Sequence, residues 1–165
     1  MRQRLRPVEL DFLRSAPVRL AFAADVAAPP ASVYRALADE VADSPEWFAA
    51  IAAARPTDGG AGRVVRLRGG VVFRERILVT AAGRCYAYRV DETNAPGIRA
   101  LLEEWALSPS GPGGAGTRVR WTMAADGAAA FRLTMRLVRP GVGRSFHGAM
   151  RALERRLAAS PPTSA

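Results

Sequence analysis

The end of the chain carries apolar residues at the three- and four-residue spacing of a single helix face. These residues are Phe131, Met135, Val138, Val142, Phe146, Met150, Leu153 and Leu157. The stripe predicts a long helix over residues 128–158, with a break or kink near Pro140, because proline cannot donate the helical hydrogen bond. Strand-like segments occupy most of the chain before it. The sequence therefore predicts an α+β fold, in which a curved antiparallel sheet of six or seven strands wraps around one C-terminal helix.

Two short helices are predicted directly after the first strand. Residues 18–26 alternate as a strand does, and Pro29 and Pro30 follow it. Residues 33–37 then place apolar side chains at helical spacing. A second helix is predicted over residues 44–53, with Ser44 as its N-cap.

From residue 63 the apolar period changes to two, which is typical of strands. A two-residue turn at Ala82 and Gly83 predicts one inward face for the hairpin around it. The residues on that face are Phe73, Glu75, Ile77, Val79, Tyr86, Tyr88 and Val90. In the preceding hairpin, Leu67 is predicted to lie opposite Phe73.

The last two strands are predicted over residues 98–107 and 116–123. In the second, Trp121 belongs to an evident apolar face, which alternates with arginines and a threonine. In the first, Glu103 and Trp105 share one face, whereas Leu102 and Glu104 share the other. We interpret the Trp105 face as inward, and the reverse assignment stays open.

The length of 165 residues and an apolar content of 49% are typical of one globular domain. We assign residues 18–158 to that domain, residues 1–17 to an N-terminal lead-in and residues 159–165 to a flexible tail. No apolar run is long enough to cross a membrane, and the first residues lack the apolar stretch of a signal peptide. A cytoplasmic location is expected.

All 24 basic residues are arginine, and the formal net charge is +9. The absence of lysine excludes Schiff-base chemistry on a side chain. Because the arginines are scattered along the sequence, we interpret them mainly as solvated surface and expect no nucleic-acid partner; a functional anion-binding face is the alternative. With one cysteine, Cys85, and one histidine, His147, no internal disulfide, metal site or cofactor is expected.

The order strand, two short helices, antiparallel meander and long helix resembles the helix-grip fold of the START/SRPBCC superfamily. In particular, it resembles the bacterial polyketide cyclase/dehydrase and lipid-transport-like proteins. The segments that carry the resemblance are 27–39 (AAPPASVYRALAD), 47–48 (WF), 62–65 (GRVV), 73–75 (FRE), 86–90 (YAYRV) and 116–121 (GTRVRW). The resemblance implies a cavity between the concave sheet and the last helix. Because the superfamily includes carriers, receptors, cyclases and oxygenase domains, the fold alone does not determine an activity.

Two carboxylates are predicted inside this cavity, and Tyr86 and Tyr88 lie between them. Glu75, Glu103 and Tyr88 are the candidate catalytic residues, because a buried carboxylate has a raised pKa and can act as a general acid or base. A polar anchor for a ligand and structural pairing with an arginine are the alternatives for the glutamates. The predicted ligand-binding residues are Phe73, Glu75, Ile77, Tyr86, Tyr88, Trp105, Trp121, Met135 and Phe146.

Two functions fit such a cavity, which we expect to enclose about 300–1,000 Å³. The first is a carrier or sensor that binds a hydrophobic small molecule, polyketide-like or lipid-like. The second is a polyketide cyclase or dehydratase that uses acid and base residues in the same cavity. The sequence does not distinguish between them.

Overall fold

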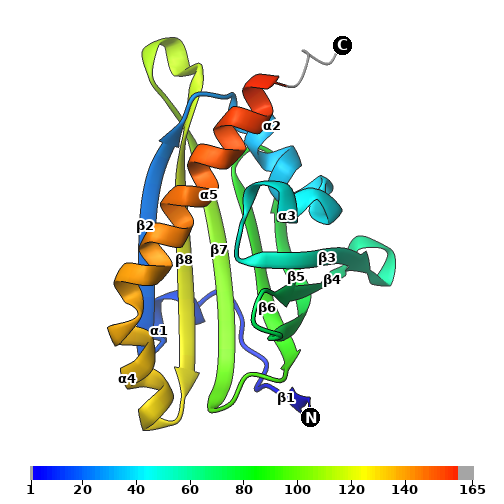
Figure 1. Cartoon of the computed structure of the whole chain (residues 1–165), viewed down its shortest axis with the longest axis vertical. Helices are drawn as coiled ribbons and strands as arrows, with labels where there is room; N and C mark the ends of the chain where they lie inside the picture. Colours follow the sequence, from blue (N-terminus) through cyan, green and yellow to red (C-terminus); the bar gives the residue numbers. More distant parts are fainter. Residues whose placement is uncertain (1, 160–165) are drawn as a thin grey trace.

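A computed structural model describes residues 2–159 and shows one antiparallel sheet with every helix but the first on its concave face (Figure 1). The strands are β1 (Gln3–Arg4), β2 (Val18–Val26), β3 (Ile51–Thr57), β4 (Gly62–Leu67), β5 (Val72–Ala81), β6 (Cys85–Thr93), β7 (Ile98–Ser110) and β8 (Gly116–Gly127). The sheet order is β2-β8-β7-β6-β5-β4-β3, and β1 pairs with β6 outside this path. The predicted α+β class and curved antiparallel sheet are therefore confirmed.

The helices are α1 (Phe12–Ser15), α2 (Pro30–Tyr34), α3 (Ser44–Trp47), α4 (Ala129–Leu137) and α5 (Arg139–Ala159). A π turn over Arg35–Asp39 continues α2, and single 3-10 turns cover Val41–Asp43, Asp58–Gly60 and Pro112–Gly114. Figure 1 shows α5 running diagonally across β7 and β8, with α2 and α3 beside its C-terminal half. Among residues 2–159, no helix is long and apolar enough to cross a membrane.

The C-terminal helix is broken where the sequence predicts it. α4 ends at Leu137 and α5 begins at Arg139, so that Pro140 lies in the first turn of α5, where its missing amide hydrogen costs nothing. α5 buries Phe146, Ala149, Met150 and Leu153 against the sheet and the short helices. Gly143 permits the close approach, because a Cβ atom there would lie 2.9 Å from the ring of Phe22.

Both faces of the sheet are covered, and by different segments. The concave face holds the largest apolar cluster, to which Trp105 and Trp121 belong. The convex face packs Leu102 and Ala124 against Phe12 of the N-terminal segment. The inward orientation predicted for Trp105 is thus confirmed, and the outward face of β7 is apolar because the N-terminal segment covers it.

The second predicted helix is much shorter than expected. α3 ends at Trp47, and residues 51–57 form the edge strand β3, although the predicted helix includes residues 51–53. Pairing with β4 decides the conformation there, because Ala54 lies opposite Val65 in the ladder. The alanine-rich sequence gave no period-2 signal for this strand, and tertiary contacts override its helix propensity.

The β5–β6 hairpin has the predicted register at its centre only. Glu75 lies opposite Val90, as expected. Toward the turn a bulge at Leu78 places Val79 opposite Ala87, so that Val79 leaves the inward face. The connection has three residues, 82–84, between paired Ala81 and Cys85, instead of the predicted two.

The β4–β5 hairpin is also displaced from the prediction. Phe73 lies opposite Val65 and not opposite Leu67. Because the displacement is two residues, all three side chains keep the predicted face. Of the predicted flexible tail, residues 159–165, only Ala159 is described, and it is the last residue of α5. Residues 160–165 lie outside the described residues.

Candidate functional site

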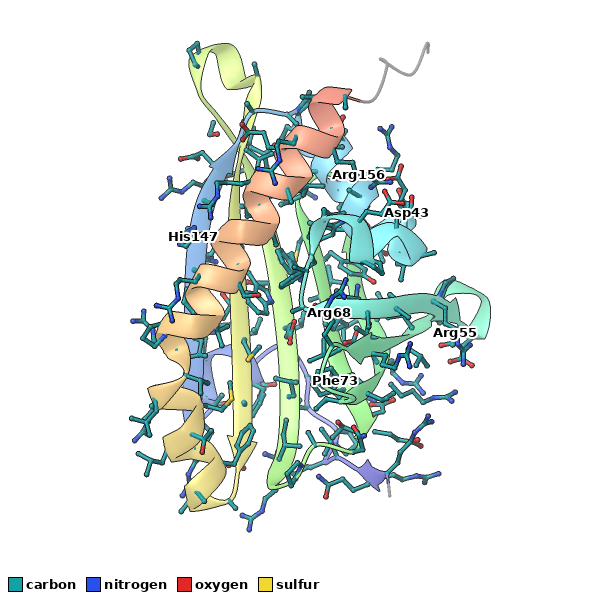
Figure 2. The ribbon with its side chains drawn as sticks, in the orientation of Figure 1. Asp43, Arg55, Arg68, Phe73, His147 and Arg156 are labelled. Atoms are coloured by element: carbon teal, nitrogen blue, oxygen red, sulfur yellow. The ribbon has the colours of Figure 1, made fainter. Side chains whose placement is uncertain are left out.

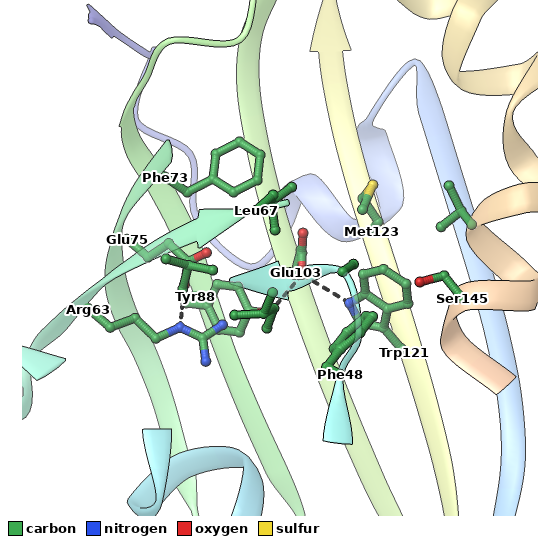
Figure 3. Close-up of a pocket in the computed structure, with 14 residues that line it drawn as sticks. Phe48, Arg63, Leu67, Phe73, Glu75, Tyr88, Glu103, Trp121, Met123 and Ser145 are labelled. Carbon is green, nitrogen blue, oxygen red and sulfur yellow. Dashed lines mark hydrogen bonds and ion pairs between the residues drawn. The ribbon is translucent and has the colours of Figure 1, made fainter. Parts of the chain in front are cut away.

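A cavity of about 200 Å³ lies between the concave face of the sheet and the first half of α5 (Figure 3). Its wall is mostly apolar, with two carboxylates, one guanidinium and two hydroxyl groups. The lining residues are Phe48, Ala50, Ile51, Arg63, Val65, Leu67, Phe73, Glu75, Tyr88, Glu103, Trp121, Met123, Val142 and Ser145. The expected cavity is therefore present, and its volume is below the 300–1,000 Å³ predicted.

Stacked aromatic side chains explain the small volume. Trp105 and Trp121 lie opposite each other on β7 and β8, with ring centroids 5.3 Å apart. Phe146 of α5 lies 6.0 Å from the Trp121 ring, and Phe22 of β2 lies 6.1 Å from it. These rings fill much of the interior beneath α5, and the remaining space extends from β4 and β5 to Met123 and Val142.

An ion pair lies in the cavity wall between β4 and β5. Arg63 and Glu75 are directly opposite in the ladder, and Arg63 Nε donates a hydrogen bond to Glu75 Oε2. Both residues are buried, with 7% and 5% of their surface exposed. Since a buried unpaired charge costs several kcal/mol, each residue makes the burial of the other possible.

Arg63 is the main polar residue that the sequence analysis missed. Its guanidinium carbon lies 4.0 Å from the centre of the Tyr88 ring and 5.4 Å from that of Tyr86, at cation–π distance. The sequence does indicate that Arg63 points inward, because Arg63 is two residues before Val65 and therefore lies on the same face of the strand. Scattered arginines elsewhere in the sequence concealed it.

Glu103 is held by a second set of hydrogen bonds. Tyr88 Oη donates to Glu103 Oε2 at 2.7 Å, and Trp121 Nε1 donates to the same oxygen at 3.0 Å. Trp105 Nε1 donates in turn to Tyr88 Oη at 3.0 Å. Among the described residues none donates to Glu103 Oε1, which leaves one acceptor of a cavity-lining carboxylate for another partner.

Burial sets the protonation of these groups. It raises the pKa of Glu75 to about 7, against the opposing attraction of Arg63, and the negative charge of Glu103 adds to the rise. Burial also raises the pKa of Glu103, although the donors Tyr88 and Trp121 lower it. Burial and the neighbouring Glu103 hold the pKa of Tyr88 well above its ordinary value. One guanidinium thus faces two carboxylates, and burial shifts the pKa of both carboxylates upward.

The structure separates the predicted ligand-binding residues into two groups. Phe73, Glu75, Tyr88 and Trp121 line the cavity, together with the catalytic candidate Glu103. The others do not: Ile77, Trp105, Met135 and Phe146 pack in the core around it, and Tyr86 lines a separate pocket of about 270 Å³ beneath α2. Arg63 belongs to the walls of both pockets.

Other residues that could carry chemistry lie elsewhere. His147 is exposed on α5, and Cys85 is half-buried at the start of β6. Within residues 2–159, no three histidine, cysteine, aspartate or glutamate side chains are grouped so that they could hold a metal ion. The polar groups of the cavity are therefore the candidate site.

Comparison with known proteins identifies the family. Residues 17–158 match the family described as polyketide cyclase / dehydrase and lipid transport, and the chain belongs to that family. Uncharacterized proteins of Mycobacterium tuberculosis and Mycobacterium bovis are 29% identical to the chain over 153 residues, which is 90% of this chain and 89% of theirs.

Several solved structures have the same fold. A START superfamily protein from Mycobacterium smegmatis superposes with a TM-score of 0.67 at 14% identity, over 85% of this chain and 97% of the other. The aromatase/cyclase Zhui from Streptomyces sp. R1128 superposes with a TM-score of 0.66 at 21% identity, over 86% of this chain and 93% of the other. At these identities the likeness concerns the fold, and the predicted START/SRPBCC resemblance is confirmed.

Proposed function

We propose that the chain binds a hydrophobic small molecule in the cavity between the sheet and α5, as a carrier or sensor. The observation that carries the proposal is the composition of the wall, in which apolar side chains surround a few convergent polar groups. That combination is typical of ligand pockets, because apolar contact supplies affinity and a few polar groups fix orientation. Family membership supports the same reading.

The polar groups indicate what the ligand carries. Glu103 Oε1 is an acceptor without a protein donor among the described residues, and it lines the cavity. A ligand hydroxyl or phenol could donate to it, and Arg63 could donate a hydrogen bond to a ligand carbonyl. A polyketide-like molecule carries both groups on an apolar skeleton, and a lipid-like alcohol or acid carries one of them.

The cavity volume limits which molecules fit without movement. About 200 Å³ is less than a drug-sized ligand occupies. Leu67, Phe73, Met123 and Val142 line the cavity and are only half-buried, so that their rotation would enlarge it. Compact aromatic molecules are therefore the first class of ligands to test.

A cyclase or dehydratase is the second candidate, and the protonation of the site favours it. Aldol cyclisation needs a base that removes a proton next to a carbonyl, and dehydration needs an acid that protonates the departing hydroxyl group. Glu75, with a pKa of about 7, is available in either form near neutral pH. Glu103 and Tyr88 are hydrogen-bonded partners within the same cavity.

Extraction of the purified chain with organic solvent, followed by mass spectrometry, tests the binding proposal. The result expected is an apolar compound with a hydroxyl or carbonyl group, enriched over an extract of the variant Val142→Trp, whose indole would occupy the cavity. Arg151→Trp, which adds the same indole on the exposed face of α5, is the matched control and should retain the compound. Equal recovery from all three proteins would contradict the proposal.

The two candidate functions differ in what Glu75→Gln and Glu103→Gln do. In a carrier, the glutamine variants still bind the compound, with changed affinity. In a cyclase or dehydratase, they bind it and lose turnover of a β-hydroxyketone substrate, because an amide neither accepts nor donates a proton at neutral pH. Absence of turnover in the unmodified chain would remove the enzyme candidate and leave the carrier.

We further propose that residues 18–158 act as one ligand-binding domain in the cytoplasm. The family match over residues 17–158 supports the extent of the domain.

A further inference from the structure

Three of the four large apolar side chains that the structure shows as exposed lie together at the junction of α4 and α5. They are Leu133, Leu137 and Val138, with 57%, 71% and 42% of their surface exposed. Leu133 and Leu137 are four residues apart, so that both project from one side of α4. Scattered exposed leucines are ordinary, but a contiguous group on one helix indicates a contact surface.

α4 is held loosely by the rest of the chain. None of its nine residues is buried, although Phe131 and Met135 contact the apolar cluster at the end of the sheet. The helix therefore has an apolar inner side, which packs only partly, and a second apolar ridge that faces solvent.

Positive charge predominates around this ridge, although Asp126 pairs with Arg132 at the start of α4. Residues 129–159 contain seven arginines and a single carboxylate, Glu154. Among the described residues, no carboxylate lies within ion-pair distance of Arg136, Arg139 or Arg144, which are exposed beside the ridge. Arg136, Arg139 and Arg144 thus add positive charge beside the ridge that no carboxylate of the described residues neutralises, whereas Arg132 and Arg156 are ion-paired.

From this arrangement we propose that α4 and the start of α5 dock onto an anionic lipid bilayer surface. Leucine side chains that project from a helix between arginines match an interface in which acyl chains lie beneath anionic headgroups. A second copy of the chain would bring the same arginines against one another, and charge repulsion opposes that contact. Nucleic acid would satisfy the arginines but would leave the three apolar side chains in water.

Docking in this way would bring the cavity close to the membrane. Val142 and Ser145, which line the cavity, follow Val138 within two turns of α5. The docking proposal does not depend on the proposed function, because the surface is separate from the cavity polar groups and its test needs no ligand.

Co-sedimentation of the full chain with lipid vesicles tests the proposal. The probes are vesicles of phosphatidylcholine alone and of phosphatidylcholine mixed with phosphatidylglycerol, at low salt and at about 0.15 M salt. The result expected is binding to the mixed vesicles that weakens with salt, and little binding to phosphatidylcholine. Leu133→Ser/Leu137→Ser and Arg136→Gln/Arg144→Gln should each weaken it by roughly tenfold or more.

A charge-matched control separates this surface from the general basic character of the chain. Arg55→Gln/Arg66→Gln removes the same charge from β3 and β4, and Figure 2 shows Arg55 on the side of the molecule away from α4. This variant should bind mixed vesicles within about twofold of the unmodified chain. Circular dichroism melting of each variant shows whether it is folded, which all these exposed positions permit.

Three results would overturn the proposal. The first is equal binding to both kinds of vesicle, and the second is equal loss of binding in the control and in the α4–α5 variants. The third is evidence that the surface binds another partner. Such evidence would be a dimer of the chain that the leucine substitutions dissociate, measured by sedimentation. It would also be a DNA duplex that competes with the vesicles and whose binding requires the arginines but not the leucines.

Discussion

Tyr88 and Glu103 lie directly opposite each other on β6 and β7, and the tyrosine hydroxyl donates a 2.7 Å hydrogen bond to the buried carboxylate. The bond joins two neighbouring strands at the wall of the cavity. It also links the Trp105 indole, which donates to the same hydroxyl, to the Trp121 indole, which donates to the same carboxylate. The polar groups of the cavity are thus positioned by the sheet itself.

Removal of the Tyr88 hydroxyl should weaken the fold without changing it. In Tyr88→Phe, Glu103 loses a donor and Trp105 loses its acceptor, both in a buried place. We expect the free energy of unfolding to fall by about 1–3 kcal/mol. Urea denaturation followed by tryptophan fluorescence measures it. Tyr34→Phe is the control, since no residue within 2–159 makes a hydrogen bond with the Tyr34 hydroxyl. A loss there as large as in Tyr88→Phe would contradict this account.

Removal of the Arg63 side chain should lower the free energy of unfolding more than removal of the Tyr88 hydroxyl does. Arg63→Met leaves the buried Glu75 without its cation, which is expected to lower the free energy of unfolding by about 3–5 kcal/mol at pH 8. At pH 5 the loss should be smaller, because Glu75, with a pKa of about 7, is then protonated. Chemical denaturation at the two pH values gives both numbers.

The double variant Arg63→Met/Glu75→Leu is the control for that experiment. It replaces both charges by apolar groups and should recover most of the stability that the single variant loses, because no unpaired charge remains. If the double variant were as unstable as Arg63→Met, packing of the arginine stem and not charge would explain the loss.

The pH dependence of stability follows from Glu75. Its pKa rises from the ordinary 4.5 to about 7 on folding, so that between these values the folded state binds more protons than the unfolded state. The contribution of Glu75 to the free energy of unfolding should therefore be greatest below about pH 4.5. It should fall by roughly 1–3 kcal/mol as the pH rises to 7. Comparison with Glu75→Gln isolates the effect, since the variant lacks the titrating group. An identical pH profile for the two proteins would show that Glu75 does not titrate in this range.

The sequence predicted those parts of the structure that depend on repeating patterns. The apolar stripe from Phe131 to Leu157 located the C-terminal helices, and Pro140 located their break. The alternation in residues 73–90 placed Glu75 and Tyr88 inside, because a strand with one buried face has one compatible register. Glu103 followed once Trp105 was assigned to the inner face.

What the sequence did not predict depends on contacts between distant segments. Residues 51–57 form a strand because β4 lies beside them, and alanines carry no signal of that pairing. The bulge at Leu78 removed Val79 from the inner face, since one inserted residue reverses the side of those after it. The volume of the cavity was overestimated because the stacking of Phe22, Trp121 and Phe146 joins three elements far apart in the chain.

Clustering of arginines on one surface was equally hidden. Arg136, Arg139 and Arg144 are no denser in the sequence than the arginines of the strands. They become a distinct surface only in the folded chain, where they are exposed beside Leu133 and Leu137 while carboxylates from other elements pair with arginines elsewhere.

The central claim is that the space between the sheet and α5 binds an apolar molecule, and calorimetric titration with 2-naphthol and naphthalene tests it most directly. The account predicts that the unmodified chain binds 2-naphthol more tightly than naphthalene, because the hydroxyl can donate to Glu103 Oε1. It further predicts that Val142→Trp abolishes binding of both and that Arg151→Trp leaves both unchanged. Binding that survives the filled cavity, or no binding of either compound to the unmodified chain, would contradict it.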